Sequence, residues 1–272
     1  MTVRLGAVGY LNARPLVFGL ENQSDYFSVR FDVPSRCAAL LEEGATDLGL
    51  IPSIEYCRNP DYRIVPGAAV ASHGPVDSVA LFLRGDIRNA QSVALDNSSR
   101  TSVALVKVLC ARHFGIAPRF ETMAPDIGVM LDRCDAALVI GDPALFLDAP
   151  ALGLTKIDLG QTWTQFTGLP FVWAFWAGRV GSASGETVMR LQQARRDGEV
   201  GIRRIAERHA EGDPARTERI DRYLRENIKY DLDGPFERGL GLFYQMAGEL
   251  GLVPAGVQPR LYESSASVQV AE

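Results

Sequence analysis

Four side-chain hydroxyls and a guanidinium are crowded into five consecutive residues of this sequence. Residues 98–102 read Ser-Ser-Arg-Thr-Ser and follow the apolar run 92–95. The run is typical of a strand and residues 103–113 of a helix, so the hydroxyls lie at a predicted helix start. Free amides and hydroxyls at a helix start bind carboxylates, whereas capping needs only one or two of them. The predicted anion site comprises Ser98, Ser99, Arg100, Thr101 and Ser102.

A second candidate site lies in the N-terminal motif Tyr-Leu-Asn-Ala-Arg-Pro, residues 10–15. The motif follows the apolar run 3–8, and Pro15 suits the first turn of a helix. Asn12 could orient a bound anion or simply cap the helix, and Arg14 could contact a ligand or be solvated. The residues alone leave these alternatives open.

Other small or polar residues also stand where predicted strands begin or end. Asp142 follows the apolar run 136–140, where it could cap the next helix or hold a ligand hydroxyl. Parallel sheets bind ligands at the carboxyl ends of their strands. We therefore expect a shared ligand crevice near these positions. The further candidates for binding are Ser35, Ser53, Ser78 and Gly141, with Asp142 also a candidate for catalysis.

Strands that alternate with helices must position these residues, which predicts an α/β fold with mainly parallel sheets. The chain of 272 residues is long enough for two lobes. Residues 171–177 form an apolar, aromatic run that is too short for a membrane span and is typical of a buried strand. With residues 157–168, this run is expected to return the chain to the first lobe. Residues 190–208, 216–227 and 235–250 have helical spacing and predict packing helices there.

Composition argues against several classes of function. The net charge of −5 comes from 28 basic and 33 acidic residues that are well mixed, so no nucleic-acid partner is expected. No nucleotide-binding or metalloprotease motif occurs and the three histidines are scattered, so we expect neither a cofactor, nor a metal, nor a nucleophilic triad. The N-terminus has no signal-peptide pattern, which predicts a cytoplasmic protein without membrane association. Buried thiols in a reducing compartment are expected for Cys37, Cys57, Cys110 and Cys134.

Six segments, in order, resemble the chorismate dehydratases of the futalosine route to menaquinone. They are VGYLNARPL, DLGLIPSIEY, HGPVDSVALFL, LDNSSRTSVAL, ALVIGDPAL and DLGQTWTQFTGLPFVWAFWA. The resemblance implies the fold of type II periplasmic binding proteins, with a ligand between two lobes that are joined by two crossing segments. It implies one lobe of residues 1–84 and 177–272, a second of residues 85–176, and crossings near residues 83–86 and 174–178.

The resemblance also implies a lyase that removes water from chorismate to give 3-[(1-carboxyvinyl)oxy]benzoate without a cofactor. It makes Asn12 the functional asparagine of the first motif and Ser78 the serine of the GPV motif. Arg14 departs from the uncharged residue expected at its position. The base is either Asp142 or the side-chain carboxylate of the substrate itself, held by Asn12. The two lobes are expected to close on the substrate, with Asn12 and residues 98–102 on opposite sides.

Two alternatives stay open at this stage. A sister enzyme of the same pathway forms the dihydroxynaphthoate ring, and resemblance to it would call for a crevice histidine and an SPCPND-like first loop. Here that loop reads GYLNARPL, and His73 is the histidine nearest to the predicted crevice. A cytoplasmic binding or sensor protein for an aromatic carboxylate would use the same crevice without a reaction.

Overall fold

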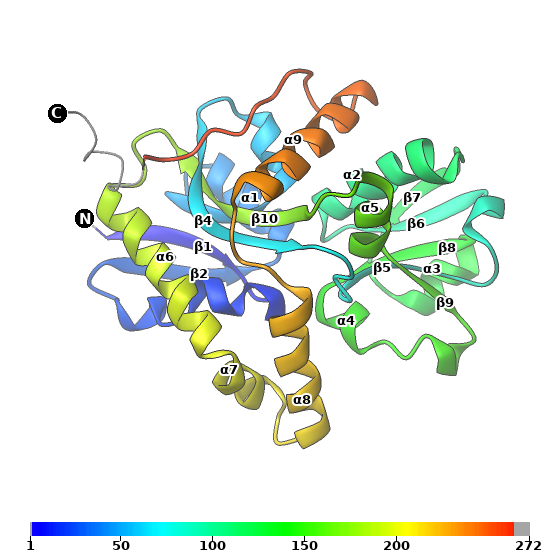
Figure 1. Cartoon of the computed structure of the whole chain (residues 1–272), viewed down its shortest axis with the longest axis horizontal. Coiled ribbons are helices and arrows are strands. Elements are labelled where there is room, and N and C mark those ends of the chain that lie inside the picture. Colours follow the sequence, from blue (N-terminus) through cyan, green and yellow to red (C-terminus); the bar gives the residue numbers. More distant parts are fainter. Residues whose placement is uncertain (1, 264–272) are drawn as a thin grey trace.

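The computed structural model describes residues 2–263 and contains two lobes, each built on a five-stranded sheet (Figure 1). The first sheet has the order β2-β1-β3-β10-β4, in which β1 is parallel to β2 and β3 while β10 is antiparallel to β3 and β4. Its strands are β1 (Val3–Val8), β2 (Phe27–Asp32), β3 (Leu48–Pro52), β4 (Tyr62–Ser72) and β10 (Phe171–Arg179).

The second sheet has the order β7-β6-β8-β5-β9. β6 is parallel to β7 and β8, and β5 is antiparallel to β8 and β9. Its strands are β5 (Val79–Leu83), β6 (Ser92–Asp96), β7 (Arg119–Met123), β8 (Ala136–Ile140) and β9 (Thr155–Asp158). The predicted two-lobed α/β architecture is therefore confirmed.

Helices flank both sheets (Figure 1). Those of the first lobe are α1 (Pro34–Glu42), α6 (Gly185–Val200), α7 (Ile202–His209), α8 (Pro214–Arg222) and α9 (Gly234–Glu249). Those of the second lobe are α2 (Arg100–Leu109), α3 (Ile127–Arg133), α4 (Gly141–Phe146) and α5 (Leu159–Thr167). Short helical turns are η1 (Leu11–Val17), η2 (Leu20–Asn22), η3 (Ser53–Arg58), η4 (Ile87–Asn89), η5 (Cys110–Phe114), η6 (Pro150–Leu152) and η7 (Tyr223–Asn227).

Strand pairing moves the predicted lobe boundaries. The predicted division into residues 1–84 with 177–272, and 85–176, puts β5 in the first lobe and most of β10 in the second. Instead, β5 pairs with β8 and β9 in the second sheet, and β10 pairs with β3 and β4 in the first. We therefore assign the crossings to residues 73–78 and 168–170. Both strands are uncharged and buried over most of their length, so hydropathy could not indicate which sheet each one joins.

Aromatic packing holds the second crossing in place. Trp163 of α5 donates a hydrogen bond from its indole nitrogen to the Pro170 carbonyl at 3.1 Å. Its ring meets Phe171 edge-on at a centroid distance of 5.2 Å, and Phe171 in turn lies 4.8 Å from Phe243 of α9. These three rings are almost fully buried. The stretch 157–178 thus fixes α5 against the first sheet, as its aromatic content indicated.

The four cysteines are buried free thiols, as predicted. Burial raises the pKa of Cys37, Cys57 and Cys110 to about 12, which keeps these thiols protonated and unreactive. His73 lies exposed in the first crossing. Within residues 2–263, no helix combines the length and the apolar character that crossing a bilayer requires.

Candidate active site

A small cavity of about 50 Å³ lies between the lobes, where the strand ends of the two sheets face one another. The first lobe contributes Val8, Tyr10, Asn12, Ala13, Pro34, Leu50, Pro52, Val70, Trp173 and Ala174. The second lobe contributes Val79, Ser99, Thr101 and Ser102. Polar groups therefore reach the cavity from two segments, the start of η1 and the start of α2.

The hydroxyls at the start of α2 are held in place by protein contacts. The Ser99 hydroxyl donates to the Ser102 hydroxyl at 2.8 Å and accepts the Ser102 amide at 3.3 Å, which makes Ser99 the cap of the helix. Thr101 accepts a hydrogen bond from the Ile54 amide of the first lobe at 3.2 Å. All three residues are at most 7% exposed. Of the five residues in the predicted anion cluster, these three line the cavity.

The other two members of the cluster point elsewhere. Ser98 donates from its hydroxyl to the carboxylate of Asp96 at 2.6 Å. Arg100 lines a second, wider inter-lobe cavity of about 450 Å³ and forms an ion pair with Glu55 of the first lobe at 2.6 Å. Glu55 is also paired with Arg58 at 3.1 Å. The positive charge expected beside a bound anion is thus neutralised by a salt bridge between the lobes.

The first turn of η1 leaves a free amide at the cavity. Asn12 lines the cavity, and within the described part of the chain its side-chain amide has no hydrogen-bond partner. Gly198 of α6 positions this segment, because a side chain there would collide with the Pro15 backbone. Arg14 is directed away, with its guanidinium 5.1 Å from the Phe31 ring, and burial lowers its pKa. Arg14 does not line the cavity.

Gly141 and Asp142 bring the second lobe against this segment. Gly141 adopts a left-handed backbone, with φ of 69°, and a Cβ there would lie 3.2 Å from the ring of Tyr10. The Asp142 carboxylate accepts the Leu11 amide of the first lobe at 3.1 Å. Burial raises the pKa of Asp142, whereas the Leu11 amide, Arg14 and Arg216 act in the opposite direction. Asp142 joins the lobes and does not line the cavity.

The three remaining predicted residues do not line the cavity. Ser53 is fully buried and donates to the Val172 carbonyl at 2.8 Å. Ser78 is 1% exposed and accepts a hydrogen bond from the Tyr223 hydroxyl at 2.7 Å. Ser35 lies in the first turn of α1, next to the cavity residue Pro34. Direct ligand contact by these serines stays a prediction.

Sequence reasoning missed two aromatic residues that line the cavity, Tyr10 and Trp173. Trp173 donates from its indole nitrogen to the Ser72 hydroxyl at 3.1 Å, which fixes the ring at the wall. Simple alternation of side chains could not have indicated Trp173, because β10 has an irregularity between Val172 and Ala174 and the adjacent residues Trp173 and Ala174 both line the cavity. Tyr10 belongs to the same sequence motif as Asn12, but the motif does not indicate on which side of the chain its ring lies.

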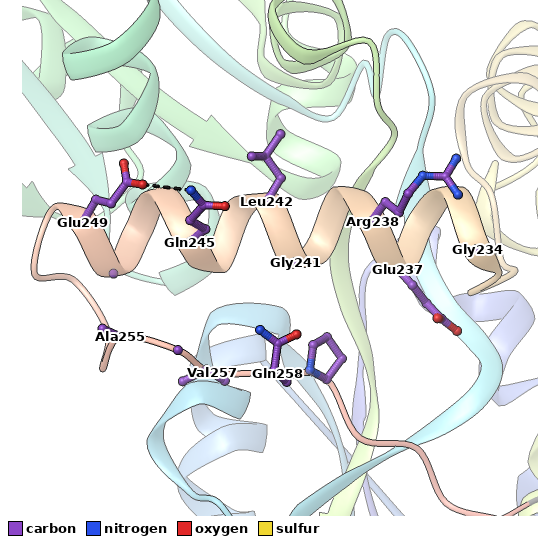
Figure 2. Close-up of a pocket in the computed structure, with 13 residues that line it drawn as sticks. Gly234, Glu237, Arg238, Gly241, Leu242, Gln245, Glu249, Ala255, Val257 and Gln258 are labelled. Carbon is purple, nitrogen blue, oxygen red and sulfur yellow. Dashed lines mark hydrogen bonds between the residues drawn. The ribbon is translucent and has the colours of Figure 1, made fainter.

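A wider groove of about 920 Å³ lies away from the strand ends, between α9 and residues 255–259 (Figure 2). Glu237, Arg238, Gln245 and Glu249 of α9 line it, with Gln245 donating to Glu249 at 3.0 Å. None of the predicted site residues lines this groove. Size therefore does not select the candidate site, whereas the convergence of both lobes on the small cavity does.

Residues 3–249 match the model of a protein family described as menaquinone biosynthesis. The chain belongs to this family. A chorismate dehydratase from Thermus thermophilus is 33% identical over 261 residues, which covers 90% of this chain and 94% of that protein. The resemblance noted in the sequence is thereby confirmed at the level of the family.

Solved structures confirm the fold of the family member described here. Protein AF1704 from Archaeoglobus fulgidus superposes with a TM-score of 0.72 at 17% identity, over 93% of this chain and 98% of that one. The periplasmic aliphatic sulphonate-binding protein SsuA from Escherichia coli gives 0.65 at 18% identity, over 97% and 94%. The two lobes thus have the arrangement of periplasmic binding proteins. No group of three potential metal ligands occurs among residues 2–263.

Proposed function

We propose that this protein is a chorismate dehydratase, a lyase that converts chorismate into 3-[(1-carboxyvinyl)oxy]benzoate and water. The observation that carries the proposal is the 33% identity to the Thermus thermophilus chorismate dehydratase over nearly the whole length of both chains. The inter-lobe cavity supports it independently, because its polar groups suit a small dianion whose two carboxylates lie apart.

The start of α2 suits the ring carboxylate of chorismate. The reaction removes the hydrogen at C3, which bears the enolpyruvyl ether, and the hydroxyl at C4, after which the ring is aromatic. Loss of the hydrogen pushes negative charge through the ring double bond onto the ring carboxylate. Hydroxyls and free amides at Ser99, Thr101 and Ser102 stabilise that developing charge, and the positive end of the helix dipole adds to the effect.

Asn12 suits the second carboxylate, on the enolpyruvyl side chain. An asparagine amide cannot act as a base, but it orients a carboxylate through its two N–H donors. The side-chain carboxylate is tethered next to C3, and an oriented intramolecular base needs no further residue. Asp142, the competing candidate, lies behind the cavity wall with its carboxylate on the Leu11 amide. The geometry thus favours the substrate as its own base.

The remaining walls suit the ring of the substrate. Trp173 offers an aromatic surface held by Ser72, and Val8, Leu50, Val70 and Val79 complete an apolar lining. Exclusion of water strengthens the interactions with the developing anion, because the local dielectric is low.

Incubation of the purified protein with chorismate, followed by mass spectrometry, tests the proposal. We expect loss of chorismate and formation of an aromatic product that is lighter by one water. Recovery of unchanged chorismate after prolonged incubation would refute the dehydratase. Chorismate that is bound tightly and released unchanged would instead favour a binding or sensor protein.

A further inference from the structure

Elimination of water needs a donor for the proton that the departing C4 hydroxyl acquires. Hydroxide is a poor leaving group, so a positioned acid accelerates such a step. We propose that Tyr10 is this general acid, an inference that rests on the proposed dehydration of chorismate. Tyr10 lines the cavity from the first lobe, and among the described lining residues it is the one that carries a phenolic hydroxyl.

The other polar groups at the cavity are unsuited to donate this proton. The Ser99 hydroxyl already donates its proton to Ser102, whereas Thr101 and Ser102 accept hydrogen bonds and keep their own aliphatic hydroxyl protons. Aliphatic hydroxyls also release a proton less readily than a phenol, whose ordinary pKa is about 10. The Asn12 amide orients anions but does not act as an acid. Among the cavity residues of the described chain, Tyr10 therefore carries the one phenolic proton.

Contacts from the second lobe fix the Tyr10 side chain. Its ring packs on Gly141, where any side chain would meet ring carbons at 3.2 Å. The Ser98 hydroxyl is close enough to lower the pKa of Tyr10, and it donates to the Asp96 carboxylate at 2.6 Å. Asp96 is 1% exposed and lies at the end of β6, directly before α2. We assign Ser98 and Asp96 as positioning residues that orient the phenol beside the start of α2.

The surroundings also keep the phenol protonated. Burial raises the pKa of Tyr10 most strongly, the nearby carboxylates of Asp96 and Asp142 raise it further, and Ser98 lowers it. A general acid must hold its proton before the reaction, and this phenol does so at neutral pH. The raised pKa also makes the proton harder to transfer, so the proposed role depends on the position of Tyr10 at the cavity.

The step balances without a further reactant. The side-chain carboxylate of chorismate takes the C3 proton, and the electrons of the C3–H bond enter the ring. The C4–O bond breaks with its electron pair on oxygen, which takes the Tyr10 proton and leaves as water. The phenolate then takes the proton from the side-chain carboxyl group of the product, which restores Tyr10 and leaves the product as a dianion.

Tyr10→Phe removes the hydroxyl and keeps the ring on Gly141. With chorismate, we expect kcat to fall at least about a hundredfold, in the range of general acid catalysis, with little change in KM. A chorismate analogue that carries fluorine in place of the C4 hydroxyl distinguishes chemistry from structure, because fluoride depends far less on protonation as it leaves. The ratio of wild-type to variant rates should approach one with this analogue.

Two further variants complete the test. Tyr56→Phe is the matched control, since Tyr56 lies outside the cavity and binds the Gln258 carbonyl and the Arg260 amide, so its rate ratio should stay near one for both substrates. Ser98→Ala leaves the Tyr10 ring intact and should show a smaller loss with chorismate and none with the analogue, which keeps the inference testable if Tyr10→Phe is unstable.

Two outcomes would overturn the role of Tyr10 and leave the dehydratase standing. One is near wild-type turnover of chorismate by Tyr10→Phe. The other is an equal loss with chorismate and with the fluorinated analogue, since a purely structural role would lower both rates alike. A wild-type protein that leaves chorismate unchanged would instead refute the proposed function itself, and Tyr10's role with it.

Discussion

The start of α2 and the start of η1 bring polar groups to opposite sides of one cavity, but protein contacts occupy these groups to different degrees. At α2, Ser99 binds Ser102 and Thr101 binds the Ile54 amide. In the first turn of η1, the Asn12 side-chain amide has no hydrogen-bond partner within the described residues. The hydroxyl wall, formed by Ser99, Thr101 and Ser102, is therefore part of the scaffold that joins the lobes, whereas the Asn12 amide is free to meet a ligand, as proposed above. Substitutions in the two walls should have different consequences.

Loss of the free amide should have the largest effect. We expect Asn12→Ala to lower turnover of chorismate at least about a hundredfold, as for removal of one preorganised donor, with little change in the melting temperature. Asn22→Ala, an exposed asparagine in η2, is the matched control and should keep normal turnover. Near-normal turnover by folded Asn12→Ala would abolish the distinction between the two walls.

The hydroxyl wall should couple stability to binding. Thr101→Val keeps the shape of the side chain but leaves the buried Ile54 amide without its acceptor, which costs about 1–3 kcal/mol of unfolding free energy. Affinity for the product should fall about tenfold, measured by calorimetry. Thr155→Val, on an exposed position of β9, controls for the substitution itself. Unchanged stability and affinity in Thr101→Val would show that this wall is neither scaffold nor binding surface.

The sequence predicted the architecture and much of the hydroxyl wall, since alternating strands and helices and a crowded helix start are local patterns. The direction in which each side chain points was not predictable from these local patterns. Arg100 forms an ion pair with Glu55, which lies 45 residues away in the sequence and is brought close only by the packing of the two lobes. The position of β5 was missed for a related reason, because its partners are chosen by tertiary packing. Trp173 was hidden in an apolar run whose inward and outward faces are distinguished only in the folded sheet.

Substitution of Asp142 tests whether this residue acts as the base in place of the substrate carboxylate. Asp142→Asn keeps an oxygen for the Leu11 amide, and we expect turnover within severalfold of wild type if the substrate supplies the base. A loss of a hundredfold or more in the folded variant would make Asp142 the base, and Asn12 would then no longer be the group that sets up proton removal.

The pH dependence of stability provides an independent readout of Asp142. Its folded pKa is raised above the ordinary value of 3.8, so the folded state holds the proton more tightly than the unfolded state. Its contribution to stability is complete below pH 3.8 and is lost as the pH rises through the folded pKa. The stability of Asp142→Asn relative to wild type should therefore rise over that window in urea titrations. A difference in unfolding free energy between the variant and the wild type that does not change with pH would contradict the raised pKa of Asp142.

Exhaustive chelation and desalting should have the smallest effect. Both walls offer hydroxyls, amides and backbone donors, and the mechanism derived above assigns every proton and charge to these groups or to the substrate. Turnover after treatment with a chelator should equal that of the untreated enzyme. Activity that is lost and then restored by a divalent ion would show that a metal bridges the two walls.

A crystal structure with 3-[(1-carboxyvinyl)oxy]benzoate tests the central claim most directly, namely that one ligand lies between the two walls. We expect its ring carboxylate at the start of α2, near Ser99 and Ser102, and its side-chain carboxylate on the Asn12 amide, with the ring against Trp173. Product bound in the groove between α9 and residues 255–259 (Figure 2), or bound to one lobe without Asn12, would contradict the account.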